Sequence, residues 1–160
     1  MENKDIDLTL VNPFLSAAYD VFKQIFNCEL RKGQITIKQE PLAAYEIAIL
    51  IGITGDMYTG VVIYSMKKYS AVKIAQSLDP NAHITEGNES FADALGELAN
   101  IISGNAMSEF AKNGVNLTIT TPSLIKGEAF EIHLLKQTTL CAEMISPFGV
   151  LEINVAIKKF

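Results

Sequence analysis

The sequence has few of the residues that bind metals or form disulfides. It contains two cysteines, Cys28 and Cys141, two histidines, His83 and His133, and no tryptophan. Two cysteines cannot make a disulfide framework or a four-thiolate zinc site. Two histidines leave little for a histidine-rich centre, so we expect this chain to hold no metal.

The sequence also lacks an excess of positive charge and a long hydrophobic run. Its 13 Lys and Arg residues stand against 18 Asp and Glu residues, which gives a net charge of −5. An acidic chain without a basic stripe argues against nucleic acid and anionic membrane surfaces as partners. The longest purely apolar run, residues 47–51, is far short of the roughly 18–20 residues of a membrane span.

The length and the start of the chain indicate one soluble domain. The 160 residues are 49% hydrophobic and 19% charged, which is typical of a globular protein. No linker rich in Pro, Gly or Ser interrupts them, so a single domain over residues 1–160 is predicted. The polar, mixed-charge N-terminus does not resemble a secretory signal, which predicts a cytoplasmic protein with reduced cysteines.

Hydrophobic periodicity predicts an α+β fold. The 3.6-residue period and the end signals Asn12-Pro13 and Asn113-Gly114 predict helices over residues 12–27, 67–78 and 90–113. Alternation and apolar runs predict strands over residues 30–39, 44–54, 57–66, 115–120, 130–134, 140–144 and 151–157. We therefore expect a mostly antiparallel sheet packed against two long helices and one shorter helix.

The long helix has an unusual face opposite its buried stripe. On a helical wheel the buried stripe consists of Leu95, Leu98, Ile102, Ala106 and Phe110. The opposite strip consists of Asp93, Glu97, Asn100 and Gly104, flanked by Gly96, Ser103 and Ser108. Each glycine inside a helix costs about 1 kcal/mol relative to alanine, and no long basic side chain screens this face before Lys112. A face of small residues around one acid and one amide lets another protein's backbone come close.

Glu97 and Asn100 form the candidate reactive pair on this strip. They are three residues apart, which puts their Cβ atoms about 5–6 Å from each other. A carboxylate can pair with a partner's lysine, and a primary amide can donate and accept at once and so orient a water. Together these functions suit hydrolysis of a phosphoryl group held on another protein, where the catalyst mainly positions the attacking water.

Structural interpretations of the same residues stand beside the functional one. Ser90 to Asp93 matches a capping box, which would explain Asp93. Glu97 alone reads as a solvated acid, Asn100 as a tolerated surface residue, and Gly104 as room for a neighbouring element.

The segment 93–106, Asp-Ala-Leu-Gly-Glu-Leu-Ala-Asn-Ile-Ile-Ser-Gly-Asn-Ala, resembles the CheC/CheX/FliY chemotaxis phosphatases, most closely the CheX-type branch. It fits the family pattern of Asp or Ser, three residues, Glu, two residues, Asn and a distant Pro. Pro122 is the candidate proline, with 21 residues between it and Asn100, one fewer than the family spacing. The start of the first predicted helix, residues 11–15, also resembles the start of CheX-type proteins.

The resemblance implies a function and a CheC-like fold. The family dephosphorylates the phosphoaspartate of CheY-type response regulators. Glu97 would then pair with a regulator lysine and Asn100 would orient the attacking water, with Asp93, Gly96, Gly104 and Pro122 at the contact surface. No cofactor would be bound by this chain, and Mg²⁺ would belong to the regulator. The resemblance also implies a homodimer, for which strand 151–157 is the predicted sheet edge.

Three further interpretations concern a second site, the alternative function and the cysteines with His133. CheC-type relatives carry a second motif copy, and Ser16, Asp20 and Lys23 repeat the spacing of the first; because Lys23 cannot orient water as an amide does, one site per chain is expected. The alternative function is a non-catalytic adaptor of the same fold that binds a response regulator or a flagellar or sensory component. The cysteines and His133 are interpreted as packing or surface residues.

Overall fold

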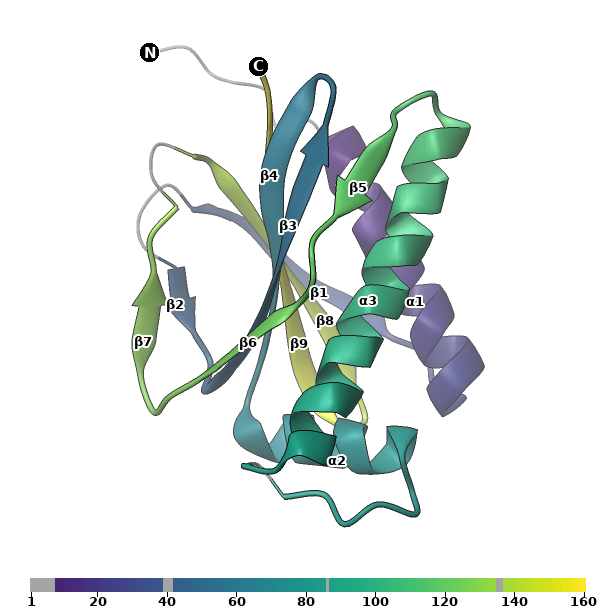
Figure 1. The fold of residues 1–160 in the computed structure, drawn as a ribbon, viewed down its shortest axis with the longest axis vertical. Coiled ribbons are helices and arrows are strands. Elements are labelled where there is room, and N and C mark those ends of the chain that lie inside the picture. Colours follow the sequence, from purple (N-terminus) through teal and green to yellow (C-terminus); the bar gives the residue numbers. More distant parts are fainter. Residues whose placement is uncertain (1–7, 39–41, 86, 135–136) are drawn as a thin grey trace.

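Two long helices pack against one face of a β-sheet, and a shorter helix lies at its end, in the computed structural model, which describes residues 8–38, 42–85, 87–134 and 137–160 (Figure 1). The helical elements are η1 (Leu8–Leu10), α1 (Asn12–Phe26), α2 (Lys68–Leu78) and α3 (Glu89–Lys112). The strands are β1 (Arg31–Lys38), β2 (Leu42–Ala44), β3 (Ile47–Gly55), β4 (Tyr58–Met66), β5 (Leu117–Ile119), β6 (Ser123–Lys126), β7 (Phe130–Ile132), β8 (Thr139–Ser146) and β9 (Gly149–Lys159).

The strands form a seven-stranded sheet with the order β1-β8-β9-β4-β3-β5, in which β6 also pairs with β3. All pairs are antiparallel, and β2 and β7 make a separate two-stranded sheet. Together with the three α-helices, this confirms the predicted α+β fold of a mostly antiparallel sheet with two long helices and one shorter helix.

The ends of α1 follow local backbone preferences. The helix begins at Asn12 with Val11 as its cap residue, and the Val11 side chain makes no capping hydrogen bond, so the prediction that Asn12 is the cap is wrong. Pro13 still fits the first turn, where a missing N–H costs nothing. Asn27 ends the helix in the left-handed region with φ of 51°, which asparagine tolerates better than most residues.

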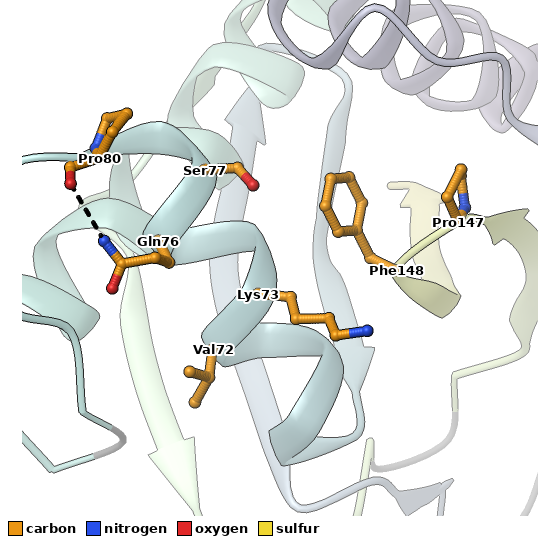
Figure 2. A pocket seen from close by; sticks show the side chains of 7 residues that line it. All are labelled: Val72, Lys73, Gln76, Ser77, Pro80, Pro147 and Phe148. Atoms are coloured by element: carbon orange, nitrogen blue, oxygen red, sulfur yellow. Dashed lines mark hydrogen bonds between the residues drawn. The ribbon is translucent and has the colours of Figure 1, made fainter.

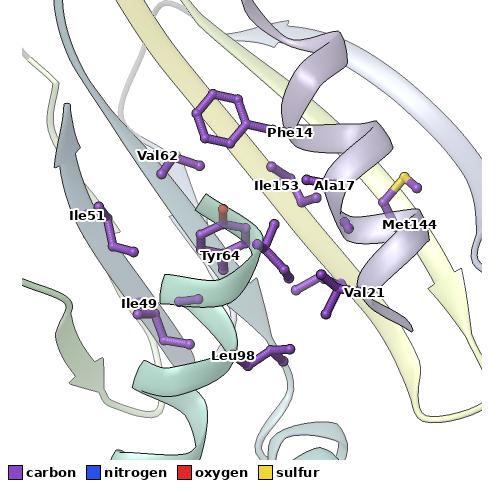
Figure 3. Packing of buried hydrophobic residues seen from close by; sticks show 14 of the residues in the cluster. Phe14, Ala17, Val21, Ile49, Ile51, Val62, Tyr64, Leu98, Met144 and Ile153 are labelled. Carbon is purple, nitrogen blue, oxygen red and sulfur yellow. The ribbon is translucent and has the colours of Figure 1, made fainter. Parts of the chain in front are cut away.

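The main core lies between the sheet and the pair α1 and α3 (Figure 3). Alternate residues of β3 and β4 point toward the helices, among them Ile49, Ile51 and Tyr64, each no more than 1% exposed. Phe14 of α1 meets Phe110 of α3 edge-on, with ring centroids 5.8 Å apart. This packing fixes which side of α3 faces inward and which side is left outward.

Strand β9 differs most from its prediction. It pairs with β4 on one side and β8 on the other, so the prediction that residues 151–157 form a sheet edge is wrong. It is also not half-buried, because Glu152 and Asn154 on its second face are 7% and 2% exposed. On that second face, residues of β7 pack against Ala156 and its neighbours. The alternation within a single strand cannot reveal that another segment covers it.

Other strand boundaries shift modestly. The predicted strand 44–54 is divided between β2 and β3, and β6 was not predicted at all. Gln39, the predicted end of the first strand, and the seven N-terminal residues lie outside the described residues, as does Glu86 in the predicted polar stretch before the long helix.

Candidate functional site

Helix α3 begins one residue earlier than predicted because Asn88 caps it. The Asn88 Oδ1 accepts a hydrogen bond from the Phe91 N–H at 2.9 Å, and its Nδ2 donates to the His83 carbonyl at 2.6 Å. Asn88 therefore satisfies one of the free amides of the first turn. The capping box that would have explained Asp93 is wrong, and Asp93 is an exposed residue inside the helix.

The helix presents the predicted faces, with one exception. Its buried residues are Phe91, Leu95, Leu98, Ala99, Ile102, Ser103, Ala106 and Phe110. Asp93, Glu97 and Asn100 are exposed together on the opposite side. Ser103 was expected beside this strip, but it is fully buried, with its hydroxyl 2.8 Å from the hydroxyl of Tyr64.

The exposed strip has chemically free side chains. Among the residues that the structure describes, none forms an ion pair with Asp93 or Glu97, and none hydrogen-bonds the side chain of Asn100. The carboxylate of Glu97 can therefore receive a cation from outside the chain, and the amide of Asn100 retains both its donors and its acceptor.

The two glycines of α3 leave space that this chain does not fill. Gly96 and Gly104 are both half-buried, and a Cβ added at either would meet no neighbouring atom within 4 Å. The interpretation that Gly104 makes room for a neighbouring element of this chain is therefore wrong. Both positions accept the helix penalty of glycine without an internal packing reason.

Pro122 lies on the connection between β5 and β6, and it is half-buried. Both strands contact α3 and both pair with β3 (Figure 1). Thr120, two residues earlier, anchors this connection to β3: its N–H donates to the Gly52 carbonyl at 2.9 Å, and its Oγ1 accepts from the Gly52 N–H at 2.8 Å. The connection is thus held beside the helix that carries Glu97 and Asn100.

A groove between α1 and α3 borders the strip. Asp20 and Ser16 line it from α1, and Asn105 and Ser108 line it from α3. Ser16, Asp20 and Lys23, which repeat the motif spacing, are all exposed.

A separate hollow lies between α2 and the turn that joins β8 to β9. Lys73 and Ser77 point toward Phe148 and Pro147, while Gln76 turns away toward Pro80 (Figure 2). No residue of α3 lines this hollow.

The remaining candidate residues lack reactive surroundings. Burial, with the nearby Glu152 carboxylate, raises the pKa of the Cys141 thiol to about 12. Burial also raises the pKa of Cys28, so neither thiol is activated as a nucleophile. His133 is exposed, and its Nε2 lies 3.8 Å from the Glu131 carboxylate. These features agree with packing and surface roles.

The described residues show neither a metal cluster nor a membrane-spanning helix. No three His, Cys, Asp or Glu side chains there gather in a way that could hold a metal ion. Within the same residues, no helix combines the length and the apolar character needed to cross a membrane.

The pair of hydroxyl groups of Tyr64 and Ser103, which lies beneath α3, was not predicted from the sequence. A signal existed in the sequence, because Ser103 falls beside Ala99 and Phe110 on the helical wheel and therefore near the buried stripe. Its partner on a distant strand could not be identified from that position.

Comparison with known proteins places these features in a family. The family model of chemotaxis phosphatase CheX matches residues 47–145, while no curated protein matches the chain. A CheC-like superfamily protein from Shewanella sp. PV-4 is 23% identical, with 96% of this chain and 99% of that chain covered and a TM-score of 0.85. Chemotaxis protein CheX from Vibrio vulnificus is 24% identical, with 94% and 99% covered and a TM-score of 0.83.

A third similar structure is the CheX-CheY-BeF3-Mg²⁺ complex from Borrelia burgdorferi, which is 25% identical, with 93% of this chain and 97% of that chain covered and a TM-score of 0.76. The family match spans most of the sheet and the whole of α3, including Glu97 and Asn100. The chain therefore belongs to the chemotaxis phosphatase CheX family.

Proposed function

We propose that this chain, as a single domain over residues 1–160, accelerates hydrolysis of the phosphoaspartate of a phosphorylated CheY-type response regulator. The observation that carries the proposal is the exposed Glu97 and Asn100 pair on a helix face whose two glycines leave open space. Membership of the CheX family and the Borrelia burgdorferi complex of CheX with CheY support a partner of this kind.

The two side chains would divide the work between docking and chemistry. The Glu97 carboxylate would pair with a lysine ammonium of the regulator, which fixes the partner on the strip. Asp93, Gly96, Gly104 and Pro122 would form the surrounding contact, where the glycines allow close approach. A charged pair that becomes desolvated between two proteins contributes mainly to binding and register.

Asn100 would enter the regulator's active site and hold the attacking water. Its Oδ1 can accept a hydrogen bond from one O–H of the water, so that a lone pair of the water oxygen points at phosphorus. The new P–O bond forms as the bond to the aspartyl oxygen breaks. The carboxylate leaves with the electron pair, and the water gives up one proton to the phosphate product or solvent. Fixing the water in line supplies much of what such a reaction requires.

Mg²⁺ would reside on the regulator, where it neutralises charge on the phosphoryl group. This chain's own contribution is then confined to a carboxylate and an amide. We propose a cytoplasmic location for it, since the phosphorylated regulator is its substrate.

The direct test adds the purified protein to a phosphorylated regulator and follows loss of the phosphoryl group. We expect hydrolysis faster than the spontaneous rate. Binding of the regulator without any acceleration would instead support the non-catalytic adaptor and overturn the phosphatase.

Changing Glu97 to alanine is expected to weaken binding more than it slows the chemical step. Loss of one exposed, charge-assisted contact should raise the KM for the phosphorylated regulator by about tenfold, which equals roughly 1.4 kcal/mol. The rate at saturating regulator should stay within about threefold. A matched control is Glu109→Ala, because Glu109 lies on the same helix but lines the α1 groove. An unchanged KM in the Glu97 variant would remove Glu97 from the docking surface.

We also propose the homodimer that the resemblance implies. Light scattering by the purified protein measures its mass in solution, which should be that of two chains. Since β9 is central, a dimer that extends the sheet would have to use β1 or the β5 and β6 side. Edge strand β1 carries Arg31, Lys32 and Lys38, and charges of this kind commonly oppose edge-to-edge pairing.

A further inference from the structure

We infer that the buried hydrogen bond between Tyr64 and Ser103 is a positioning device, which holds α3 at the rotation that presents Asn100 outward. This inference rests on the proposed function for its catalytic consequence. Its structural part, the fixing of α3 on the sheet, can be measured separately.

The bond joins the middle of the sheet to the middle of the helix. Tyr64 belongs to β4 and its side chain lies between the sheet and α3 (Figure 3). Tyr64 is 1% exposed and Ser103 is 0% exposed, and their hydroxyl oxygens are 2.8 Å apart. Burial raises the pKa of Tyr64 well above its usual range, so both groups stay neutral and one O–H donates to the other oxygen.

Apolar side chains hold this part of α3 on the sheet. Leu98, Ala99 and Ile102 of the helix are each no more than 2% exposed, and they pack above Tyr64 with no room for a water molecule between them. These contacts lie directly under the turn that carries Glu97 and Asn100, so the rotation of this turn depends on how α3 sits on Tyr64.

The hydrogen bond between Tyr64 and Ser103 restrains the rotation of α3, because a hydrogen bond depends on direction and apolar packing does not. Its strength falls when the donor angle departs from linear, whereas apolar contacts depend little on angle. Ser103 lies three residues after Asn100, so the two occupy adjoining positions on the helix surface. A rotation that breaks the bond therefore moves Asn100 by the same angle.

The expected displacement is large enough to affect catalysis. Side-chain atoms lie about 5–6 Å from a helix axis, so a rotation of about 10° would move the Asn100 amide by about 1 Å. A misplacement of about 1 Å can cost up to about 100-fold in rate when a group must position a reactant. Loss of the bond should thus reduce the rate of the chemical step more than it reduces docking, which Glu97 supports.

Ser65 provides a matched control on the same strand. It follows Tyr64, is 0% exposed, and its Oγ accepts a hydrogen bond from the Tyr45 N–H at 2.8 Å. Its side chain points to the opposite face of the sheet from Tyr64. Ser65→Ala therefore removes a buried serine hydroxyl of similar kind without touching α3.

The experiment compares the wild type with Tyr64→Phe, Ser103→Ala and Ser65→Ala, in kinetics and in hydrogen exchange of the α3 amides. In Tyr64→Phe the Ser103 hydroxyl can still bond a carbonyl of its own helix, so that variant changes position with little desolvation penalty. For both α3-facing variants we expect kcat about tenfold lower and KM within about twofold. Exchange over residues 97–104 should be about tenfold faster. Ser65→Ala should change neither quantity by more than about twofold.

Each result bears on the inference. If all three variants lose rate to the same degree, the bond acts only through stability and the inference is overturned. If the wild type does not accelerate hydrolysis, the proposed function fails. Exchange then decides the structural part, which is overturned if the two α3-facing variants match Ser65→Ala. The double variant Tyr64→Phe with Ser103→Ala leaves no hydroxyl unpaired, and its kcat should still be about tenfold low although its unfolding midpoint recovers.

Discussion

Changing Asn100 to alanine is expected to slow dephosphorylation of the regulator by about 100-fold while binding stays within about twofold. The amide holds the attacking water, and removal of one group that acts in the transition state typically costs about 10²–10³ in rate. Asn100 is exposed and its side chain bonds no described residue, so its removal should not affect folding. Single-turnover loss of the phosphoryl group at saturating protein measures the chemical step.

Asn105→Ala is the matched control for this experiment. Asn105 is also an exposed asparagine of α3, but it lines the groove toward α1 and not the strip. We expect its variant to keep the wild-type rate. Asn100→Asp should also be slow, because a carboxylate cannot donate and repels the phosphoryl oxygens. Full activity in Asn100→Ala would show that the site is assigned wrongly, while the family membership would stand.

The sequence predicted α3 and its faces well because that information is local. A 3.6-residue period places Leu95 and Ile102 on one side and Glu97 and Asn100 on the other, whatever the rest of the chain does. The start of the helix was predicted one residue too late. The capping box from Ser90 to Asp93 indicated a start at Ser90, whereas Asn88 caps the helix and its amide also donates to the His83 carbonyl.

The face of a strand that a distant segment covers could not be predicted in the same way. Alternation along residues 151–157 indicates one polar face, and such a face usually meets solvent. In this chain Glu152 and Asn154 are buried, and β7 packs on a neighbouring part of that face. The order of the strands is equally non-local, so the central place of β9 depends on pairings with β4 and β8 that no pattern within β9 encodes.

The Ser103 contact shows the same limit inside the site itself. The wheel placed Ser103 beside the exposed strip, because a small polar residue near an edge of the buried stripe can belong to either side. In the structure the Tyr64 hydroxyl oxygen lies 2.8 Å from the Ser103 hydroxyl oxygen, and Ser103 is on the buried side of the helix. Only the packing of α3 on β4 brings these two residues together.

Changing Gly104 to tryptophan is expected to weaken binding of the regulator by about 100-fold, or roughly 2.7 kcal/mol. The strip would then carry a bulky side chain where we propose that the partner's backbone approaches, and such a clash acts against the complex and not against the fold. A Cβ at this position meets no neighbouring atom within 4 Å, so a side chain can leave the helix here, and the unfolding midpoint of the variant checks that it folds. Gly104→Ala should even raise the free energy of unfolding by about 1 kcal/mol, since alanine favours the helix.

A control of equal bulk separates a local clash from a general effect of tryptophan. Asn105→Trp places the same side chain one residue further along α3, toward the α1 groove, and should leave the Kd within about threefold. Calorimetry with a regulator whose aspartate carries beryllofluoride, a mimic of the phosphoryl group, measures both Kd values. Equal Kd values for the Gly104 and Asn105 variants would mean that the partner does not lie over Gly104. The open space beside the glycine would then need an explanation other than close approach, because a helix gains about 1 kcal/mol from alanine at a position that nothing else constrains.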